Sequence, residues 1–164
     1  FAQGAQDAGH ATQIADLHAE GFDPRWTLAD NDGPPPADAL REQARIAQAD
    51  AVCFVFPLFW WGMPAMTKGW VDRVWSWGWA YDQLDDPDLS LQRPRTAVFL
   101  IPAGARSDEM DERGYLDALE TAWLQGTFGY FGFTQRHLEV LNGRCHCSAL
   151  RPVPTNRNNV HTTT

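Results

Sequence analysis

The chain concentrates its aromatic residues in one short segment. Six of its eight tryptophans lie between residues 54 and 82, and Trp60 and Trp61 are adjacent within the sequence LFWWG. Indole rings offer large flat faces, and backbone N–H groups in such a loop can bond the polar edge of a heterocycle. The loop therefore suits a flat, electron-poor ring as ligand. A packed core or an oligomer interface would also account for so many aromatic side chains.

The position of this loop between two expected elements supports the ligand hypothesis. A continuous apolar run, Ala51 to Phe56, predicts a strand buried on both faces of a parallel sheet. Pro64 is expected to open a helix that runs to about Trp77. Ligands of open parallel sheets bind outside the carboxyl ends of the strands. We therefore expect the ligand at Leu58 to Gly62.

The helix after Pro64 is apolar around most of its circumference. Met66, Trp70, Val74 and Trp77 share one face, and an adjacent face carries further apolar side chains, Val71 and Trp75. A helix of this kind must be covered on more than one side. The sheet can cover one side, and a second subunit is the candidate for the other, so most of these tryptophans are expected in a core and a dimer interface.

The remaining elements follow from apolar periodicity and from glycine and proline positions. Together they predict an α/β fold with a parallel sheet. The expected elements are a helix end at Phe1–Ala8 closed by Gly9, a strand at Ala11–Leu17, a helix at Asp38–Gln48 with Leu40, Ala44 and Ala47 on one face, a strand at Arg95–Ile101, a helix at Asp111–Tyr130 and a strand at Gln135–Leu141.

Composition limits the class of partner. The 164 residues carry a net charge of -8, which argues against nucleic acid or an anionic membrane as the main partner. No run is long and apolar enough to insert into a bilayer. Three cysteines without regular spacing indicate a reducing compartment, with Cys53 as a buried free thiol. Cys145-His146-Cys147 fits no common zinc spacing, and no metal is expected.

The aromatic segment resembles a known family. The sequence FPLFWWGMPAMTKGWVDRVW, followed by AYD, is similar to the motif of NAD(P)H:quinone oxidoreductases, the flavodoxin-like two-electron quinone reductases. The matched positions are Phe56, Pro57, Leu58, Phe59, Trp60, Trp61, Pro64, Ala65, Lys68, Gly69, Trp70, Asp72, Arg73, Val74, Ala80 and Tyr81. The resemblance extends over roughly residues 1–141.

This resemblance implies a three-layer α/β/α fold with strand order 2-1-3-4-5 and a cytoplasmic homodimer whose active site lies at the subunit interface. FAD, with FMN as an alternative, would bind at the strand ends. Pro57, Leu58, Phe59, Trp60 and Trp61 would wrap its isoalloxazine ring, and Ala103, Gly104 and Ala105 would close the other edge. NAD(P)H would give a hydride to the flavin and leave, and a quinone would then take it in a ping-pong reaction.

Two positions depart from the family pattern. Members carry Thr-Thr-Gly-Gly where this chain has Pro102-Ala103-Gly104-Ala105, so the hydroxyl groups are absent while Gly104 keeps close backbone approach possible. Members also place a tyrosine and a histidine shortly afterwards. Here Tyr115 is the one tyrosine in that region and is assigned the catalytic role; packing on the surface in the first turn of a helix is the alternative.

The ends of the chain depart from the family pattern as well. The first strand and the phosphate-binding loop of the family would precede Phe1, so we expect a piece of a longer enzyme, with residues 1–141 as an incomplete flavodoxin-like domain that retains flavin poorly. Residues 142–164 are expected to form an irregular tail, disordered or translated out of frame. Alternative functions are reduction of azo or nitro compounds, a regulatory flavoprotein subunit of a potassium-efflux system, and an inactive fragment.

Overall fold

A three-stranded parallel sheet forms the centre of the computed structural model, which describes residues 1–81 and 94–142. Its strands are β1 (Ala51–Val55), β2 (Arg95–Ala103) and β3 (Phe133–Asn142), in the order β1-β2-β3. Phe54 pairs with Phe99 across the first ladder, and Phe99 pairs with Leu138 across the second. The predicted parallel sheet is confirmed. Asn142, the first residue of the predicted tail, belongs to β3, and the rest of the tail, with the Cys-His-Cys motif, lies outside the described residues.

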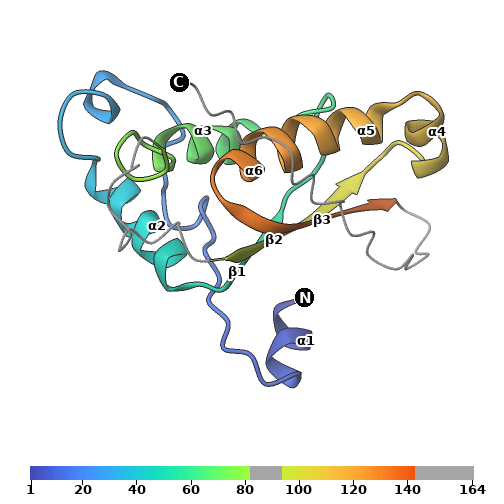
Figure 1. The fold of residues 1–164 in the computed structure, drawn as a ribbon, viewed down its shortest axis with the longest axis horizontal. Helices are drawn as coiled ribbons and strands as arrows, with labels where there is room; N and C mark the ends of the chain where they lie inside the picture. Colours follow the sequence, from blue (N-terminus) through green and yellow to red (C-terminus); the bar gives the residue numbers. More distant parts are fainter. Residues whose placement is uncertain (82–93, 143–164) are drawn as a thin grey trace, which may run out of the picture.

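Helices lie along one side of this sheet (Figure 1). They are α2 (Ala37–Gln48), α3 (Ala65–Val74) and a consecutive series of α4 (Ser107–Glu112), α5 (Tyr115–Leu119), the π-helix η2 (Glu120–Thr127) and α6 (Phe128–Tyr130). The prediction of one continuous helix from Asp111 to Tyr130 is therefore wrong. Gly114, at a φ of 72°, separates α4 from α5, and a wider helical turn follows.

Aromatic side chains fill the space between the sheet and the helices. Phe54 of β1 stacks on Phe99 of β2 with ring centroids 5.0 Å apart, and Phe128 packs edge-on against Phe99 at 4.7 Å. Trp75, 3% exposed, contacts Phe128 at 5.9 Å. Part of the aromatic segment thus serves the core, namely Phe54, Phe56, Trp70 and Trp75. The expectation that β1 is buried on both faces is wrong, because Val55 is 65% exposed.

The first helix, α1 (Ala2–Asp7), ends as predicted at Gly9, whose φ is 89°. The N–H of Gly9 donates to the carbonyl of Gln6, and the N–H of His10 donates to the carbonyl of Ala5. This pair of bonds caps the helix in a Schellman motif. The strand predicted at Ala11–Leu17 is wrong. No described strand lies beside this segment, so its backbone joins no ladder.

The buried face of α2 differs from the predicted one. Leu40 is 47% exposed, while Glu42 and Gln43 are buried at 1% and 5% exposure. These two polar side chains are bonded to the region of α3. Glu42 accepts a hydrogen bond from Trp70 Nε1 at 3.1 Å, and the Gln43 amide donates to the Val74 carbonyl at 2.9 Å. Because both groups have partners, their burial is tolerated.

The helix α3 begins after Pro64 as predicted but ends at Val74, three residues earlier than expected. Trp77 therefore lies beyond the helix and is 67% exposed, so its predicted position on one helix face with Met66, Trp70 and Val74 is wrong. The helix is held by the segment before α2. Arg73 donates a hydrogen bond to Asp30, on that segment, at 2.7 Å and another to Asp38, on α2, at 2.6 Å. These ion pairs fix α3 and hence the loop before it.

Candidate functional site

The loop between β1 and α3 contains a tight turn built on two tryptophans. The N–H of Phe59 donates to the carbonyl of Gly62 at 3.1 Å, and the N–H of Gly62 donates back to Phe59 at 2.9 Å. Trp60 and Trp61 occupy the two central positions with φ angles of 50° and 61°. Both φ angles are positive, as in a type I′ turn, whose central positions normally carry asparagine or glycine. Two bulky residues in this conformation strain the backbone, a feature that clusters at functional sites.

This turn is fixed at the carboxyl ends of the strands. The N–H of Leu58 donates to the carbonyl of Pro102, at the end of β2, with an N–O distance of 2.9 Å. Leu58 also packs against the core, while Pro57 before it is exposed. The bond joins the loop after β1 to the end of β2. The structure thus brings together two of the segments that the sequence assigns to one site.

The third predicted component lies against the same turn. Tyr115, the first residue of α5, stacks on Trp61 with ring centroids 4.0 Å apart and an interplanar angle of 26°. Gly114 positions α5 by taking a left-handed conformation at its N-cap. On the other side of the turn, Trp60 is 96% exposed and makes no ring contact among the described residues. The site therefore presents one stacked indole and one free indole.

The segment after β2 supplies open backbone beside the turn. Ala103 ends β2, and Ala105 packs its methyl group against the core. No described residue lies within 4 Å of the place where a Cβ of Gly104 would stand. Within residues 1–81 and 94–142, the N–H groups of Trp60, Trp61 and Gly104 donate no hydrogen bond. These donors and the exposed indole faces fit a flat heterocycle with polar edges.

Several residues of the aromatic segment have structural rather than chemical roles. A Cβ on Gly69 would lie 2.0 Å from the carbonyl oxygen of Pro24, so glycine here allows the close approach of a loop to α3. Trp70 bonds the buried Glu42, and Arg73 bonds the carboxylates described above. Among the described residues, the one ion pair at the exposed surface of α3 joins Lys68 and Asp72. Sequence patterns missed the partners of Gly69, Trp70 and Arg73 because these partners lie up to 50 residues away in the chain.

The cysteine of β1 contributes no reactive thiol. Burial raises the pKa of the Cys53 thiol to about 11, so the protonated form dominates at neutral pH. Cys53 lies in the middle of β1, away from the strand end that carries the turn. The prediction of a free thiol is confirmed, although the side chain is half-buried rather than buried.

The fold and the site define a class: an open α/β protein with aromatic side chains gathered in the loops at the carboxyl ends of its parallel strands. The chain belongs to the flavodoxin-like fold family, whose model matches residues 1–149. No described helix has the length and apolar character needed to cross a membrane.

Three relatives illustrate the position of the chain in this family. It is 31% identical over 140 residues to an "Uncharacterized NAD(P)H oxidoreductase" of Haemophilus influenzae, covering 83% of this chain and 69% of that protein. It is 27% identical over 150 residues to the ribosyldihydronicotinamide dehydrogenase [quinone] of Mus musculus, covering 79% and 61%. The structure of an NAD(P)H:quinone oxidoreductase from Methanothermobacter marburgensis superposes with a TM-score of 0.75 at 28% identity, covering 89% and 74%. The chain thus spans 69% and 61% of the lengths of these two curated relatives.

Proposed function

We propose that this chain, with a flavin bound, catalyses the two-electron reduction of quinones or similar acceptors by NAD(P)H. The observation that carries the proposal is the strained turn of Trp60 and Trp61 at the strand ends, stacked on Tyr115 and beside the open backbone of Gly104. The names of the relatives, which are quinone and NAD(P)H oxidoreductases, point to the same chemistry.

The residues present fit a flavin ring. Trp60 and Trp61 would lie along the ring with Pro57, Leu58 and Phe59 supporting the turn, and the N–H groups of Trp60, Trp61 and Gly104 would donate to its polar edge. Ala103 and Ala105 would flank Gly104 on the opposite edge. When bound, the flavin supplies the two-electron redox chemistry; we infer FAD, with FMN as the alternative to be tested. The chain's own contribution is to bind the ring, orient it and limit access of water.

Tyr115 is the titratable side chain that contacts the turn directly, through its ring on Trp61. Its hydroxyl would donate a hydrogen bond to the oxygen of an acceptor held over the same aromatic platform. Such a bond favours negative charge that develops on the acceptor oxygen during reduction. We therefore assign Tyr115 as the catalytic residue, and its stacking on Trp61 fixes the plane of its ring beside the turn.

We further propose a homodimer through the tryptophan-rich segment. The chain itself covers Trp70 and Trp75, so the surface available to a second copy lies beyond α3. There Trp77 and Tyr130 are 67% and 71% exposed, and Tyr81 links them, with ring centroids 5.6 Å from Trp77 and 6.5 Å from Tyr130. The free thiol of Cys53 is compatible with the reducing cytoplasm, where we place the reaction.

An absorbance experiment tests the function. The purified chain is titrated with FAD or with FMN, and NADPH and afterwards a quinone are then added under anaerobic conditions. We expect a protein-bound flavin spectrum that bleaches with NADPH and returns with the quinone. A matched variant, Trp61→Ala, should bind flavin more weakly. Bound flavin that NADPH does not bleach would refute the reductase proposal, and an unchanged flavin spectrum during the titration would refute the assigned site in this chain.

A further inference from the structure

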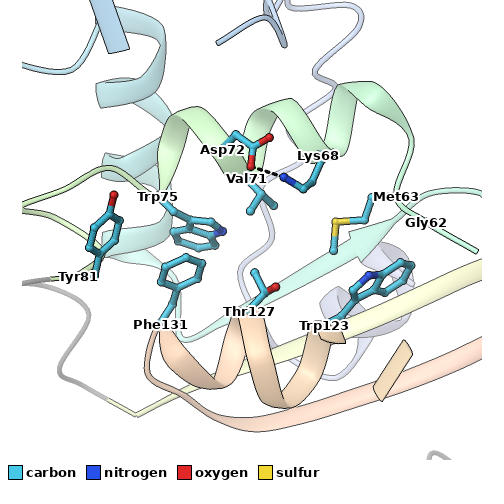
Figure 2. Close-up of a pocket in the computed structure, with 10 residues that line it drawn as sticks. All are labelled: Gly62, Met63, Lys68, Val71, Asp72, Trp75, Tyr81, Trp123, Thr127 and Phe131. Carbon is cyan, nitrogen blue, oxygen red and sulfur yellow. Dashed lines mark hydrogen bonds and ion pairs between the residues drawn. The ribbon is translucent and has the colours of Figure 1, made fainter. Parts of the chain in front are cut away.

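A cavity opens next to the aromatic turn, between α3 and the series η2–α6 (Figure 2). Its volume is about 530 Å³, within the range of sites for small molecules. Aromatic and aliphatic side chains from the two helical segments and from the loops that flank them form most of its wall: Met63, Val71, Trp75, Tyr81, Trp123 and Phe131. The cavity is therefore lined mainly by apolar side chains, and its volume can hold a small ring compound.

One buried polar group in this wall has no partner. Trp75 is 3% exposed, and its ring nitrogen Nε1 finds no hydrogen-bond acceptor within the described residues. Figure 2 shows the nitrogen on the side of the ring that faces Val71 and Thr127. The Thr127 hydroxyl is bonded elsewhere, to the Ala122 carbonyl at 3.1 Å. An unpaired buried N–H is unfavourable, so an acceptor brought in by a ligand would stabilise this wall.

The charged groups of the cavity indicate a neutral ligand. Lys68 and Asp72, one turn apart on α3, form an ion pair at the rim. Because the two charges compensate each other, the rim attracts neither an anion nor a cation strongly. We propose that this cavity binds a neutral, flat aromatic carbonyl compound whose oxygen accepts a hydrogen bond from Trp75 Nε1. The nitrogen is covered by its neighbours, so binding includes a small shift of the wall.

The ring of such a ligand would lie among the aromatic side chains of the wall. Trp75 and Phe131 already pack together with ring centroids 4.8 Å apart, and Trp123 is among the lining residues on η2. Gly62 and Met63 line the cavity directly after the turn that carries Trp60 and Trp61. The cavity is thus a neighbour of the proposed flavin site, but its binding chemistry requires no flavin.

A matched pair of ligands tests this inference on the full 164-residue chain without flavin. 1-Indanone and indane have the same flat bicyclic frame, and only the ketone carries an acceptor. Titrations are followed through the indole N–H signals in ¹H–¹⁵N NMR spectra, with Trp75→Phe used to assign the signal. We expect 1-indanone to move the Trp75 N–H proton downfield and to bind about fivefold more tightly than indane, the gain of one net hydrogen bond. Equal binding of the two compounds would overturn the proposal, as would an unmoved Trp75 signal.

Variants locate the binding site independently. Trp75→Phe should lose the preference for 1-indanone over indane, while Trp26→Phe, on an exposed loop, should keep it. Thr127→Met, which extends a longer side chain into the cavity, should weaken binding of both compounds. Unchanged binding in folded Thr127→Met would place the ligand elsewhere and refute the site. If Trp75→Phe does not fold, the comparison of 1-indanone and indane on the unaltered chain still tests the proposal.

Discussion

Trp61 and Tyr115 stack face to face with ring centroids 4.0 Å apart, although 54 positions separate them in the sequence. Trp61 sits in a turn after β1, and Tyr115 begins a helix after β2. The contact therefore connects two strand-end segments of the parallel sheet. It gives the turn a support on one face, and it leaves the neighbouring Trp60 free in solvent.

The stack makes Tyr115 important for flavin affinity as well as for chemistry. Tyr115→Leu removes the ring contact, worth about 0.5–1.5 kcal/mol, and should raise the dissociation constant of flavin about three- to tenfold. Tyr115→Phe keeps the ring and should bind flavin like the unaltered chain. Flavin fluorescence titration measures both constants. If the hydroxyl acts on the acceptor, Tyr115→Phe should also lower quinone reduction in stopped-flow traces while its flavin affinity stays unchanged.

Equal affinities for Tyr115→Leu and the unaltered chain would show that the stack does not support the flavin site. Full quinone reduction in Tyr115→Phe would remove the catalytic assignment but leave the packing role. The two substitutions therefore separate the ring of Tyr115 from its hydroxyl.

The strained turn predicts a gain of stability on removing a side chain. Trp60 has a φ of 50° and is 96% exposed, so it makes little packing contact that a substitution would lose. Trp60→Gly should relieve the left-handed strain and raise the free energy of unfolding by about 1 kcal/mol. The same change removes an aromatic face and should weaken flavin binding. Urea denaturation and flavin titration measure the two effects.

Trp60→Leu is the matched control, because leucine keeps the backbone strain while it removes the indole. It should lose flavin affinity without gaining stability. A stability gain of the same size in both variants would mean that exposure of the indole, rather than the φ angle, lowers the free energy of unfolding of the unaltered chain.

Close packing of α3 predicts a large effect at Gly69. A Cβ there would stand 2.0 Å from the Pro24 oxygen, and backbone cannot move away cheaply. Gly69→Ala should therefore lower the free energy of unfolding by about 3 kcal/mol, at the upper end of overpacking effects. Gly4→Ala is the control: it lies within α1, with nothing within 4 Å, and alanine favours helix. Comparable urea midpoints for the two variants would contradict the close contact.

The parts of the fold that sequence could predict are those set by local pattern. The apolar runs of β1 and β2 are long enough to need burial, and Pro64 marks the start of α3 at its N-cap. The turn at Trp60 and Trp61 follows from the same logic, because a short segment between a strand and a helix must lie at the strand end. The stack of Trp61 on Tyr115 has no local signal.

The parts that sequence missed depend on partners far along the chain. Counting apolar residues on α2 selected Leu40, whereas the structure buries Glu42 because Trp70 supplies a donor 28 residues later. The strand expected at Ala11–Leu17 failed for a related reason. Its apolar content predicts a strand, but a strand forms only where a neighbouring strand receives its backbone hydrogen bonds.

The ion pairs of Arg73 predict an acid-sensitive fold. Hydrogen bonds from Arg73 lower the pKa of Asp38, and for Asp30 the hydrogen bonds from Thr27 and Arg73 outweigh the opposing effect of burial, so its pKa is lowered as well. A carboxyl whose pKa is lower in the folded chain contributes stability above its unfolded pKa and loses it as pH falls through the folded value. We expect the urea midpoint to fall steeply below about pH 4, the ordinary range of aspartate.

Substitutions identify these pairs as the source of that fall. Asp38→Asn removes one titrating group, so its urea midpoint should depend less on pH between about pH 5 and pH 2 than that of the unaltered chain. Arg73→Met should cost about 3–5 kcal/mol at pH 7, because it leaves the buried Asp30 carboxylate, 1% exposed, without its cation. Arg25→Met breaks an exposed pair with Asp23 and should leave the midpoint unchanged. If Arg25→Met and Arg73→Met behaved alike, the burial of the Arg73 pairs would not be what holds α3 to the segment before α2.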